Sequence, residues 1–188
     1  MTWLQTYSGK AYIIANPTAD QICLSDIAHA LANQCRFAGH SRRFYSVAEH
    51  SVYVYDRVRE LLVGKEEPTE LDRKILLAAL FHDATEAYLL DIPRPLKVES
   101  QMEFYREMHK KTRKVIFEKY KIPQRRLSLI QEADNELLAT EKEQVMTTPP
   151  QPWEDLPEPL NITISCWTPP VATFTFRKCA ESLGVKDD

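Results

Sequence analysis

Four ionisable side chains occupy positions where the helical pattern of the sequence calls for apolar ones. They are His50, the adjacent pair His82 and Asp83, and Asp134. Burying such groups without partners is costly, so they must pair, form hydrogen bonds or bind a metal ion. Two imidazoles and two carboxylates suit a divalent metal ion such as Mn, Co, Zn or Fe better than calcium, and Mg stays open as an alternative. The four residues predict a metal site with free positions for water and a phosphate oxygen.

Taken singly, these residues have ordinary explanations. A lone buried histidine is more often a hydrogen-bonded core residue than a ligand, and a His-Asp dipeptide is common by chance. Neighbours on a helix point about 100° apart. His82 and Asp83 therefore cannot both face away from the core, but both can reach one ion at the helix surface between them. The metal prediction depends on the complete set.

Together these residues resemble the H…HD…D pattern of the HD-domain metal-dependent phosphohydrolases. The motif sequences are YSVAEHS around His50, LFHDATEAY around His82 and Asp83, and QEAD ending at Asp134. The resemblance covers most of the chain. It is strongest to the compact single-domain branch that contains 5′-deoxynucleotidases and deoxynucleoside triphosphohydrolases of the dATP type. It implies an all-α HD-domain helical bundle, to which the sequence adds a small β-hairpin appendage.

The resemblance also implies roles for two further carboxylates. Glu86, three residues after Asp83, and Asp91, before a Pro-Arg-Pro turn, match positions that orient or activate the attacking water and handle the leaving group. The spacing agrees for Glu86, which lies one helical turn beyond His82 on the same face. An ordinary surface glutamate is the alternative for Glu86, and a helix-end or turn residue is the alternative for Asp91.

Substrate contacts are expected from the loop before the first metal histidine. Arg36 and Phe37 resemble the Arg-aromatic pair that contacts phosphate and nucleoside in this branch, where many relatives carry tryptophan in place of the phenylalanine. An arginine suits a phosphate through its fork of donors, and a phenyl ring can stack on a base, although core packing explains Phe37 equally well. Four further cationic side chains can meet a phosphate tail: Lys97, His40, Arg42 and Arg43. An ordinary surface charge is an equal alternative for each of them.

The expected activity is metal-dependent hydrolysis of deoxynucleotides. The leading hypothesis is that the enzyme releases triphosphate from a dNTP, such as dATP. Residues 157–160 and Cys166-Trp167 favour it, because they resemble the triphosphohydrolases. A 5′-deoxynucleotidase acting on dNMPs is the alternative. Cyclic or signalling nucleotide hydrolysis ranks lower because no additional histidine motif is visible. A non-catalytic nucleotide-binding protein also ranks lower, because every expected metal ligand is present.

The N-terminal region predicts a hairpin, a helix and a loop. Residues 3–7 and 11–14 flank a Ser-Gly-Lys turn, which is typical of a β-hairpin. Ser25-Asp26 offers an N-cap for a helix over residues 27–33. An irregular basic and aromatic loop follows over residues 35–45.

The next helix, over residues 47–63, is expected to carry His50. Ser46 caps it, with Glu49 as the capping-box partner. Its inward face by 3-4 spacing comprises Val47, His50, Val54, Val58, Leu61 and Leu62. The later segments are expected to be helices 70–89, 99–120 and 125–146, a proline-rich connection 147–159, a strand 161–167 that could join the hairpin, and a closing helix 170–183.

Two of these helices have a defined apolar side. The helix over residues 99–120 buries Phe104, Met108, Val115, Ile116 and Phe117. In the helix over residues 125–146 the buried stripe comprises Leu127, Ile130, Asp134, Leu137, Leu138 and Glu141.

Length and composition set the remaining expectations. The 188 residues fit a single domain with its core at about 25–146 and a C-terminal strand and helix within 160–184. No apolar run could span a membrane and no secretory signal is visible, which predicts a soluble, cytoplasmic protein without a membrane partner. A net charge of −3 gives no reason to bind nucleic acid, so the expected partner is a small nucleotide. The resemblance implies a homo-oligomer, a dimer or larger.

Cysteines and the remaining histidines carry no expected chemistry. The four cysteines are scattered without a C-x-x-C pair and are expected to be reduced thiols in or near the core. His29 and His109 lie outside the metal pattern and are expected to be structural or solvent-exposed.

Overall fold

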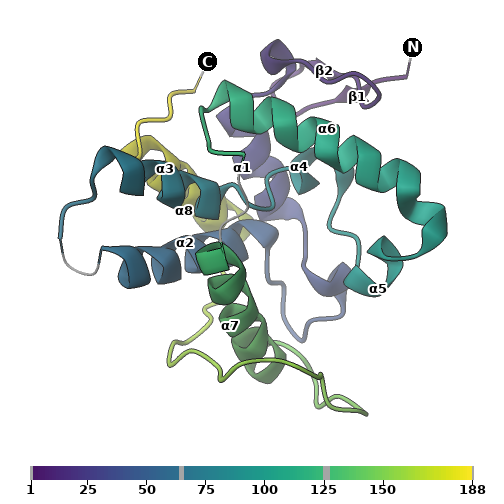
Figure 1. Cartoon of the computed structure of the whole chain (residues 1–188). Helices are drawn as coiled ribbons and strands as arrows, with labels where there is room; N and C mark the ends of the chain where they lie inside the picture. Colours follow the sequence, from purple (N-terminus) through teal and green to yellow (C-terminus); the bar gives the residue numbers. More distant parts are fainter. Residues whose placement is uncertain (1, 64–65, 125–127, 188) are drawn as a thin grey trace.

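The computed structural model of the chain describes residues 2–63, 66–124 and 128–187. Most of these residues are helical, and a short antiparallel sheet lies near the N-terminus (Figure 1). The predicted all-α class with a small β appendage is confirmed. Figure 1 shows the sheet beside α6 (Glu103–Lys119) at one end of the molecule and α7 (Ser128–Gln144) at the opposite end.

The sheet is the predicted hairpin. Strand β1 (Leu4–Gln5) pairs with β2 (Ala11–Tyr12), and Gly9 in the connection has a φ of 84°, a left-handed conformation that favours glycine. The other elements, including three short 3-10 turns labelled η, are η1 (Ala19–Gln21), α1 (Leu24–Asn33), η2 (Phe37–Gly39), α2 (Val47–Leu62), α3 (Glu70–Leu80), α4 (Glu86–Leu89), α5 (Arg94–Lys97), η3 (Ser100–Met102) and α8 (Pro169–Ser182).

Helix α2 lies at the centre of the bundle. It packs against α1, α3, α7 and α8, while α1 also packs against α4 and α8. The side chains that fill the core between these helices are apolar and fully buried, which supplies the main driving force for folding. They include Leu24, Ile27, Leu31, Val47, Val54, Val58, Leu76, Leu80, Phe81 and Phe176. Because α2 is enclosed by four other helices, this core also fixes the position of His50 within α2.

The start of α2 confirms one half of the predicted cap. The Ser46 hydroxyl accepts a hydrogen bond from the backbone N–H of Glu49 at 3.1 Å. The predicted capping-box role of the Glu49 carboxylate is wrong. Its two oxygens instead accept the backbone N–H groups of Cys166 at 2.8 Å and Trp167 at 2.6 Å, so it anchors a distant segment to α2.

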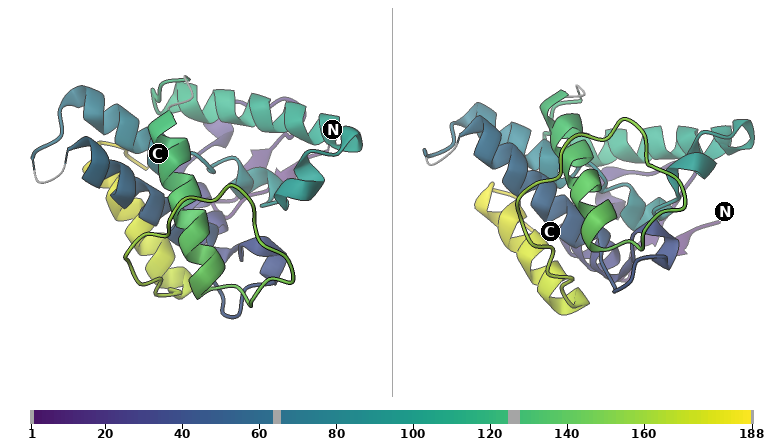
Figure 2. Two further views of the ribbon diagram at one scale, coloured as in Figure 1. Left: turned by 60° about the horizontal axis from the view of Figure 1, so that its bottom comes forward. Right: turned by 90° about the horizontal axis from the view of Figure 1, so that it is seen from below.

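That segment, predicted as a strand over 161–167, contains no strand. Its backbone groups bond to side chains of neighbouring helices and not to another strand: the Ile164 N–H bonds to Gln144 of α7 and the Ser165 N–H to Tyr53 of α2. Figure 2 shows the chain after α7 looping around that helix before it enters α8. The preceding connection, 147–159, has no helix or strand, as predicted from its prolines.

The predicted helix over 70–89 is broken at the His-Asp pair. Helix α3 ends at Leu80, residues 81–85 form turns, and α4 begins at Glu86. Phe81 ends α3 with φ −99° and ψ 11°, outside the helical region. The expectation that His82 and Asp83 lie in mid-helix is therefore wrong. Their side chains need not point about 100° apart, as those of neighbours in a helix do.

Other boundaries and faces shift by smaller amounts. Helix α1 begins at Leu24, so Ser25 lies inside it and is not its N-cap; the N–H and hydroxyl of Ser25 bond to Asp187. Helix α6 begins at Glu103, later than predicted, and Phe104 is 68% exposed, because it lies on the solvent side of that helix. Leu61, expected on the inward face of α2, is 41% exposed. The predicted Leu127 and the first residues of the helix 125–146 lie outside the described residues.

Two further sequence expectations can be compared with the described residues. None of the helices in these ranges is both long and apolar enough to cross a membrane. All four cysteines are free thiols, with Cys23 buried and the other three partly buried, as expected for thiols in or near the core.

The Ser46 cap gives a stability prediction. We expect Ser46→Ala to lower the free energy of unfolding by about 1 kcal/mol, because the buried N–H of Glu49 loses its acceptor. Urea unfolding followed by circular dichroism measures this difference.

Ser25→Ala is the matched control, because the sequence pattern gave Ser25 the same capping role for α1. In the structure its bond to Asp187 is exposed, so we expect a loss well below that of Ser46→Ala. Equal losses for the two variants would contradict the observed helix starts.

Candidate metal centre

Three separate segments bring the predicted metal ligands together. His50 lies in the first turns of α2, His82 and Asp83 lie in the turn after α3, and Asp134 lies on the face of α7 that packs toward α2. One ligand atom from each of His50, His82 and Asp134 lies within 4.8 Å of the others. The break after α3 lets both members of the His-Asp pair approach the same point.

The distances between these atoms fit a single ion. His50 Nε2 lies 3.2 Å from His82 Nε2 and 3.2 Å from Asp134 Oδ1, and His82 Nε2 lies 4.0 Å from Asp134 Oδ1. Asp83 Oδ2 joins the group at 3.2 Å from His82 Nε2 and 3.7 Å from His50 Nε2. Nitrogen and oxygen ligands lie about 2.0–2.2 Å from a metal such as zinc, so ligands of one ion lie roughly 3–4 Å apart. The four residues fit a divalent cation in both chemistry and spacing.

Hydrogen bonds on the far side of each imidazole support this assignment. His50 Nδ1 lies 2.6 Å from Glu141 Oε1, and His82 Nδ1 lies 2.8 Å from the carbonyl oxygen of Ala79. A neutral ring that donates Nδ1–H to such an acceptor presents the lone pair of Nε2 to the ligand cluster. Both Nε2 atoms therefore have the orientation that metal coordination requires.

The charges of the cluster also favour a cation. Burial alone would raise the pKa of Asp83, but His82 and His50 hold that pKa well below its usual range, and His50 lowers the pKa of Asp134 against the same burial effect. Burial opposes protonation of His82, but the adjacent Asp83 outweighs it and raises the pKa of His82 to about 9. Both carboxylates are ionised near neutral pH, and an ion that binds must displace protons from the imidazoles.

The two predicted catalytic carboxylates lie beside this cluster. Glu86 begins α4 and is 2% exposed, and Asp91 follows the end of α4. Lys97 Nζ lies 2.8 Å from Glu86 Oε1 and 3.7 Å from Asp91 Oδ1, while Glu86 Oε2 is buried without a hydrogen-bond partner. Burial, reinforced by Asp83 and Asp91, raises the pKa of Glu86 to about 8 despite Lys97. Glu86 can therefore exchange a proton near neutral pH.

A cavity of about 620 Å³ opens beside these residues and contains most of the predicted substrate contacts. Arg36 lies at its wall, nearly buried, with Nη1 3.8 Å from Asp83 Oδ2. A second hollow of about 460 Å³ shares Asp83, Glu86 and Lys97 with the first. Side chains at the first cavity include Arg36, Phe37, Asp83, Glu86, Asp91, Arg94, Lys97, Gln131, Asp134, Asn135 and Trp153.

The loop that carries Phe37 has an uncommon backbone. Phe37, Ala38 and Gly39 have φ values of 55°, 51° and 82°, so two residues with side chains adopt the left-handed region. This conformation costs free energy and is retained where surrounding structure requires it. The Phe37 ring lies 6.1 Å from the ring of Trp153, a residue of the proline-rich connection. Phe37 lines the cavity and also packs against the buried cluster of Tyr45, Val145 and Ile164, so its position fits both the substrate-contact prediction and the core-packing alternative.

The remaining predicted cations are placed away from the cavity lining. His40 is exposed at the end of η2. Arg42 Nη2 donates to the carbonyl of Gln144 at 2.7 Å, at the end of α7, and Arg43 Nη2 lies 3.4 Å from the carbonyl of Ile164. The described structure brings Arg36 and Lys97 to the site and leaves these three residues outside it.

Several residues at the site had no predicted role. The sequence predicted Glu141 on the buried stripe of its helix without a functional role, and in the structure it contacts His50. Gln34 bonds through its side-chain amide to the carbonyl of Glu86 and the N–H of Asp91, which fixes both ends of α4. His109, expected to be structural or exposed, lines the second hollow and bonds to the Thr85 hydroxyl at 2.6 Å. The spacing of seven residues between Asp134 and Glu141, two helical turns, was the available signal for Glu141.

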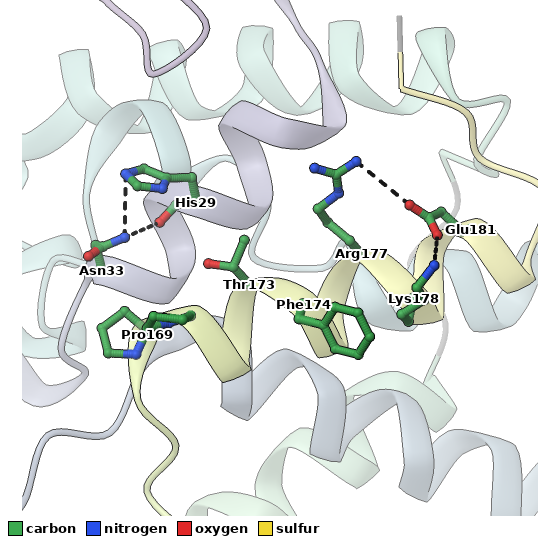
Figure 3. A pocket seen from close by; sticks show the side chains of 9 residues that line it. His29, Asn33, Pro169, Thr173, Phe174, Arg177, Lys178 and Glu181 are labelled. Carbon is green, nitrogen blue, oxygen red and sulfur yellow. Dashed lines mark hydrogen bonds and ion pairs between the residues drawn. The ribbon is translucent and has the colours of Figure 1, made fainter.

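Another hollow, of about 780 Å³, lies between α1 and α8 (Figure 3). His29 and Asn33 of α1 face it, opposite Phe174 of α8. Its two cations, Arg177 and Lys178, both pair with Glu181, at 3.7 Å and 2.8 Å. Among its described side chains this hollow lacks the combination of imidazoles and carboxylates that characterises the metal centre.

Comparison with known proteins gives two relatives. The Escherichia coli K12 protein YfdR is 41% identical over 142 residues, which cover 76% of this chain and 71% of YfdR. The Rhodobacter capsulatus protein RCAP_rcc00048 is 38% identical over 97 residues, 50% of this chain and 46% of that protein. Both relatives are described as uncharacterized. No family model matches the chain.

Metal binding can be tested at Asp134. We expect Asp134→Asn to reduce Mn²⁺ affinity by at least tenfold, because it removes one anionic ligand from the cluster. Isothermal titration calorimetry measures the affinity, and circular dichroism verifies that the helices are retained.

Glu132→Gln is the matched control, since Glu132 is an exposed carboxylate on the same helix. It should bind Mn²⁺ as the wild type does. Undiminished Mn²⁺ affinity in Asp134→Asn would remove that residue from the metal centre.

The raised pKa of Glu86 predicts how stability changes with pH in metal-free protein. The native state binds a proton on Glu86 up to about pH 8, whereas the unfolded chain releases it near its ordinary pKa. The stabilising contribution is therefore complete at acidic pH and is lost as pH rises through about 8.

Urea unfolding at pH 5, 7 and 9 in the presence of a chelator measures this effect. We expect the free energy of unfolding of wild type, relative to Glu86→Gln, to fall as pH rises. Glu132→Gln, which changes an exposed carboxylate, should follow the wild-type pH profile. A constant difference between wild type and Glu86→Gln would show that Glu86 titrates normally.

Proposed function

The chain belongs to the family of the Escherichia coli protein YfdR, and we propose that it is a metal-dependent phosphohydrolase of the HD-domain type that acts on deoxynucleotides. The observation that carries this proposal is the convergence of His50, His82, Asp83 and Asp134 next to the buried Glu86. A mixed nitrogen and oxygen ligand set of this kind, beside a carboxylate that exchanges protons near neutral pH, suits hydrolysis.

His50, His82, Asp83 and Asp134 would hold the divalent cation, which would supply Lewis-acid chemistry to a water molecule and a phosphate oxygen. The chain's own residues would then hold the substrate and move protons. Glu86 has one oxygen paired with Lys97 and one without a hydrogen-bond partner, so in its ionised form Oε2 would accept a proton from the attacking water. Asp91, on the other side of Lys97, is suited to handle the leaving group.

Two cations beside the cluster support the binding of a phosphate. Arg36 and Lys97 lie on the wall of the same cavity as Asp83, and both carry positive charge at neutral pH. Guanidinium and ammonium groups held in a partly buried site stabilise the charge that develops on a phosphoryl group. In this cavity Phe37 and Trp153 offer aromatic faces against which a nucleobase can stack.

Triphosphohydrolase activity on a dNTP is the leading form of the proposal. The two hollows share Asp83, Glu86 and Lys97, so a nucleoside in one hollow leaves room for a phosphate chain in the other. Arg113 and His109 line that second hollow. Arg113 can meet additional phosphate charge, and His109, whose pKa is lowered by burial, can offer a hydrogen bond. A 5′-deoxynucleotidase, which needs space for one phosphate only, is the alternative. A cytoplasmic location and a homo-oligomer stay predictions.

A substrate panel tests the activity. Mn²⁺-loaded protein is incubated with deoxynucleoside mono- and triphosphates, and products are separated by chromatography. We expect triphosphate and a deoxynucleoside from dNTPs, because the second hollow can take a phosphate chain. Phosphate released from dNMPs alone would favour the alternative.

Two variants serve as controls in the same assay. Glu86→Gln should lower kcat by roughly 10²- to 10⁴-fold, as expected when a group that transfers a proton is lost. Glu107→Gln, which changes an exposed carboxylate of α6, should leave kcat unchanged. Absence of turnover with every divalent metal and every nucleotide would exclude the proposed function.

A further inference from the structure

The carboxylate of Glu141 is fully buried and contacts three side chains, two from the loop over residues 35–45 and one from α2. Its Oε1 accepts the Tyr45 hydroxyl at 2.9 Å and lies 2.6 Å from His50 Nδ1. Its Oε2 accepts a hydrogen bond from Arg36 Nη2 at 2.9 Å. One carboxylate therefore joins a proposed metal ligand to a proposed phosphate-binding arginine.

The contact with His50 determines which ring nitrogen faces the metal centre. In the neutral ring that metal binding requires, the Nδ1 proton is donated to Glu141 and the lone pair of Nε2 points at His82 and Asp134. If the proton moved to Nε2, that atom could not act as a ligand. Partners of this kind on the far side of a metal-binding histidine raise metal affinity.

The contact with Arg36 keeps a cation away from the metal ligands. Arg36 Nη2 is 2.9 Å from Glu141, whereas Arg36 Nη1 is 3.8 Å from Asp83 Oδ2, beyond hydrogen-bond distance. A guanidinium that lost Glu141 would turn to Asp83, the nearest remaining carboxylate. It would then compete with a metal ion for Asp83. It would also move away from the position in which it can bind phosphate.

We propose that Glu141 is a positioning residue that holds His50 for the metal ion and Arg36 for the phosphate at the same time. The inference rests on the proposed function, since it takes its metal centre and phosphate-binding arginine from there. It adds that the two parts of the site depend on one buried carboxylate. Loss of that carboxylate should therefore weaken metal and phosphate binding together.

Glu141→Gln separates this role from ordinary packing. The amide has the same shape, but it presents one oxygen and one NH₂ group to partners that are all hydrogen-bond donors. The NH₂ group must face either Arg36 or His50, and facing His50 favours a proton on Nε2 of that ring. Whichever way the amide turns, the variant therefore loses the contact with Arg36 or the contact with His50.

Glu49→Gln is the matched control. Glu49 is also a fully buried glutamate, and its two oxygens also accept hydrogen bonds from two donors, the N–H groups of Cys166 and Trp167. The same substitution therefore causes a comparable mismatch without touching the His50 ring. Urea unfolding shows whether the two variants are destabilised to a similar extent.

Three measurements complete the test. Long-range ¹H–¹⁵N spectra of metal-free protein, recorded at a pH high enough for the His50 ring to be neutral, report which of its nitrogens is protonated. Calorimetric titration with Mn²⁺ alone gives the metal affinity, and titration of Mn²⁺-loaded protein with inorganic phosphate gives the phosphate affinity. None of these measurements requires turnover, so a failure of the proposed hydrolytic activity does not decide them.

In Glu141→Gln we expect a roughly 10- to 100-fold loss of Mn²⁺ affinity, a loss of phosphate affinity and a changed ¹⁵N spectrum of His50. Glu49→Gln should match the wild type in all three measurements. Wild-type Mn²⁺ affinity in Glu141→Gln, or equal losses in both variants, would overturn the proposal. If Glu141→Gln does not fold, Glu141→Asp replaces it, because it withdraws the carboxylate from His50 by one methylene. Wild-type Mn²⁺ affinity in that variant overturns the proposal equally.

Discussion

The imidazole of His50 is fully buried in the helix at the centre of the bundle, and both of its nitrogens need partners there. A buried polar ring without such partners would destabilise the core around it. Glu141 satisfies one nitrogen from α7, and the ligand cluster satisfies the other. The packing of α2 against α7 is therefore constrained by chemistry as well as by apolar contact, and that packing determines the distance between His50 and Asp134.

The rest of the site is arranged around that helix pair by short irregular segments. The turn after α3 brings in His82 and Asp83, and the left-handed loop at Phe37 brings in the cavity wall. Gln34 ties the end of α1 to both ends of α4, which places Glu86 and Asp91. Helices thus supply the fixed frame and half of the charged site residues, and turns and loops supply the other half, namely Arg36, His82, Asp83 and Asp91.

Negative and positive groups alternate across the site, and this limits what it can bind. Asp83 and Asp134 form one anionic centre, Arg36 and Lys97 form a cationic rim, and Glu86 stands between them. A cation suits the first of these and an anion the second, so under the proposed function a phosphate ester would lie between them. The aromatic pair in the same cavity adds a surface for an uncharged ring.

The sequence by itself determined the helical class, the hairpin, the cap at Ser46 and the four residues that converge at the candidate metal centre, because these depend on local spacing and on residue types that are costly to bury alone. Tertiary structure decided what local pattern could not express. The alternating segment 161–167 is no strand, because Glu49, Tyr53 and Gln144 offer side-chain partners to its backbone. The sequence pattern predicted one helix through the His-Asp pair, but α3 ends at Leu80, and the turn that follows brings His82 and Asp83 close to His50 of α2 and Asp134 of α7. The sequence predicted the position of Glu141 but no role for it. Its charge is explained only by the contacts with Arg36, Tyr45 and His50, which are distant in the sequence.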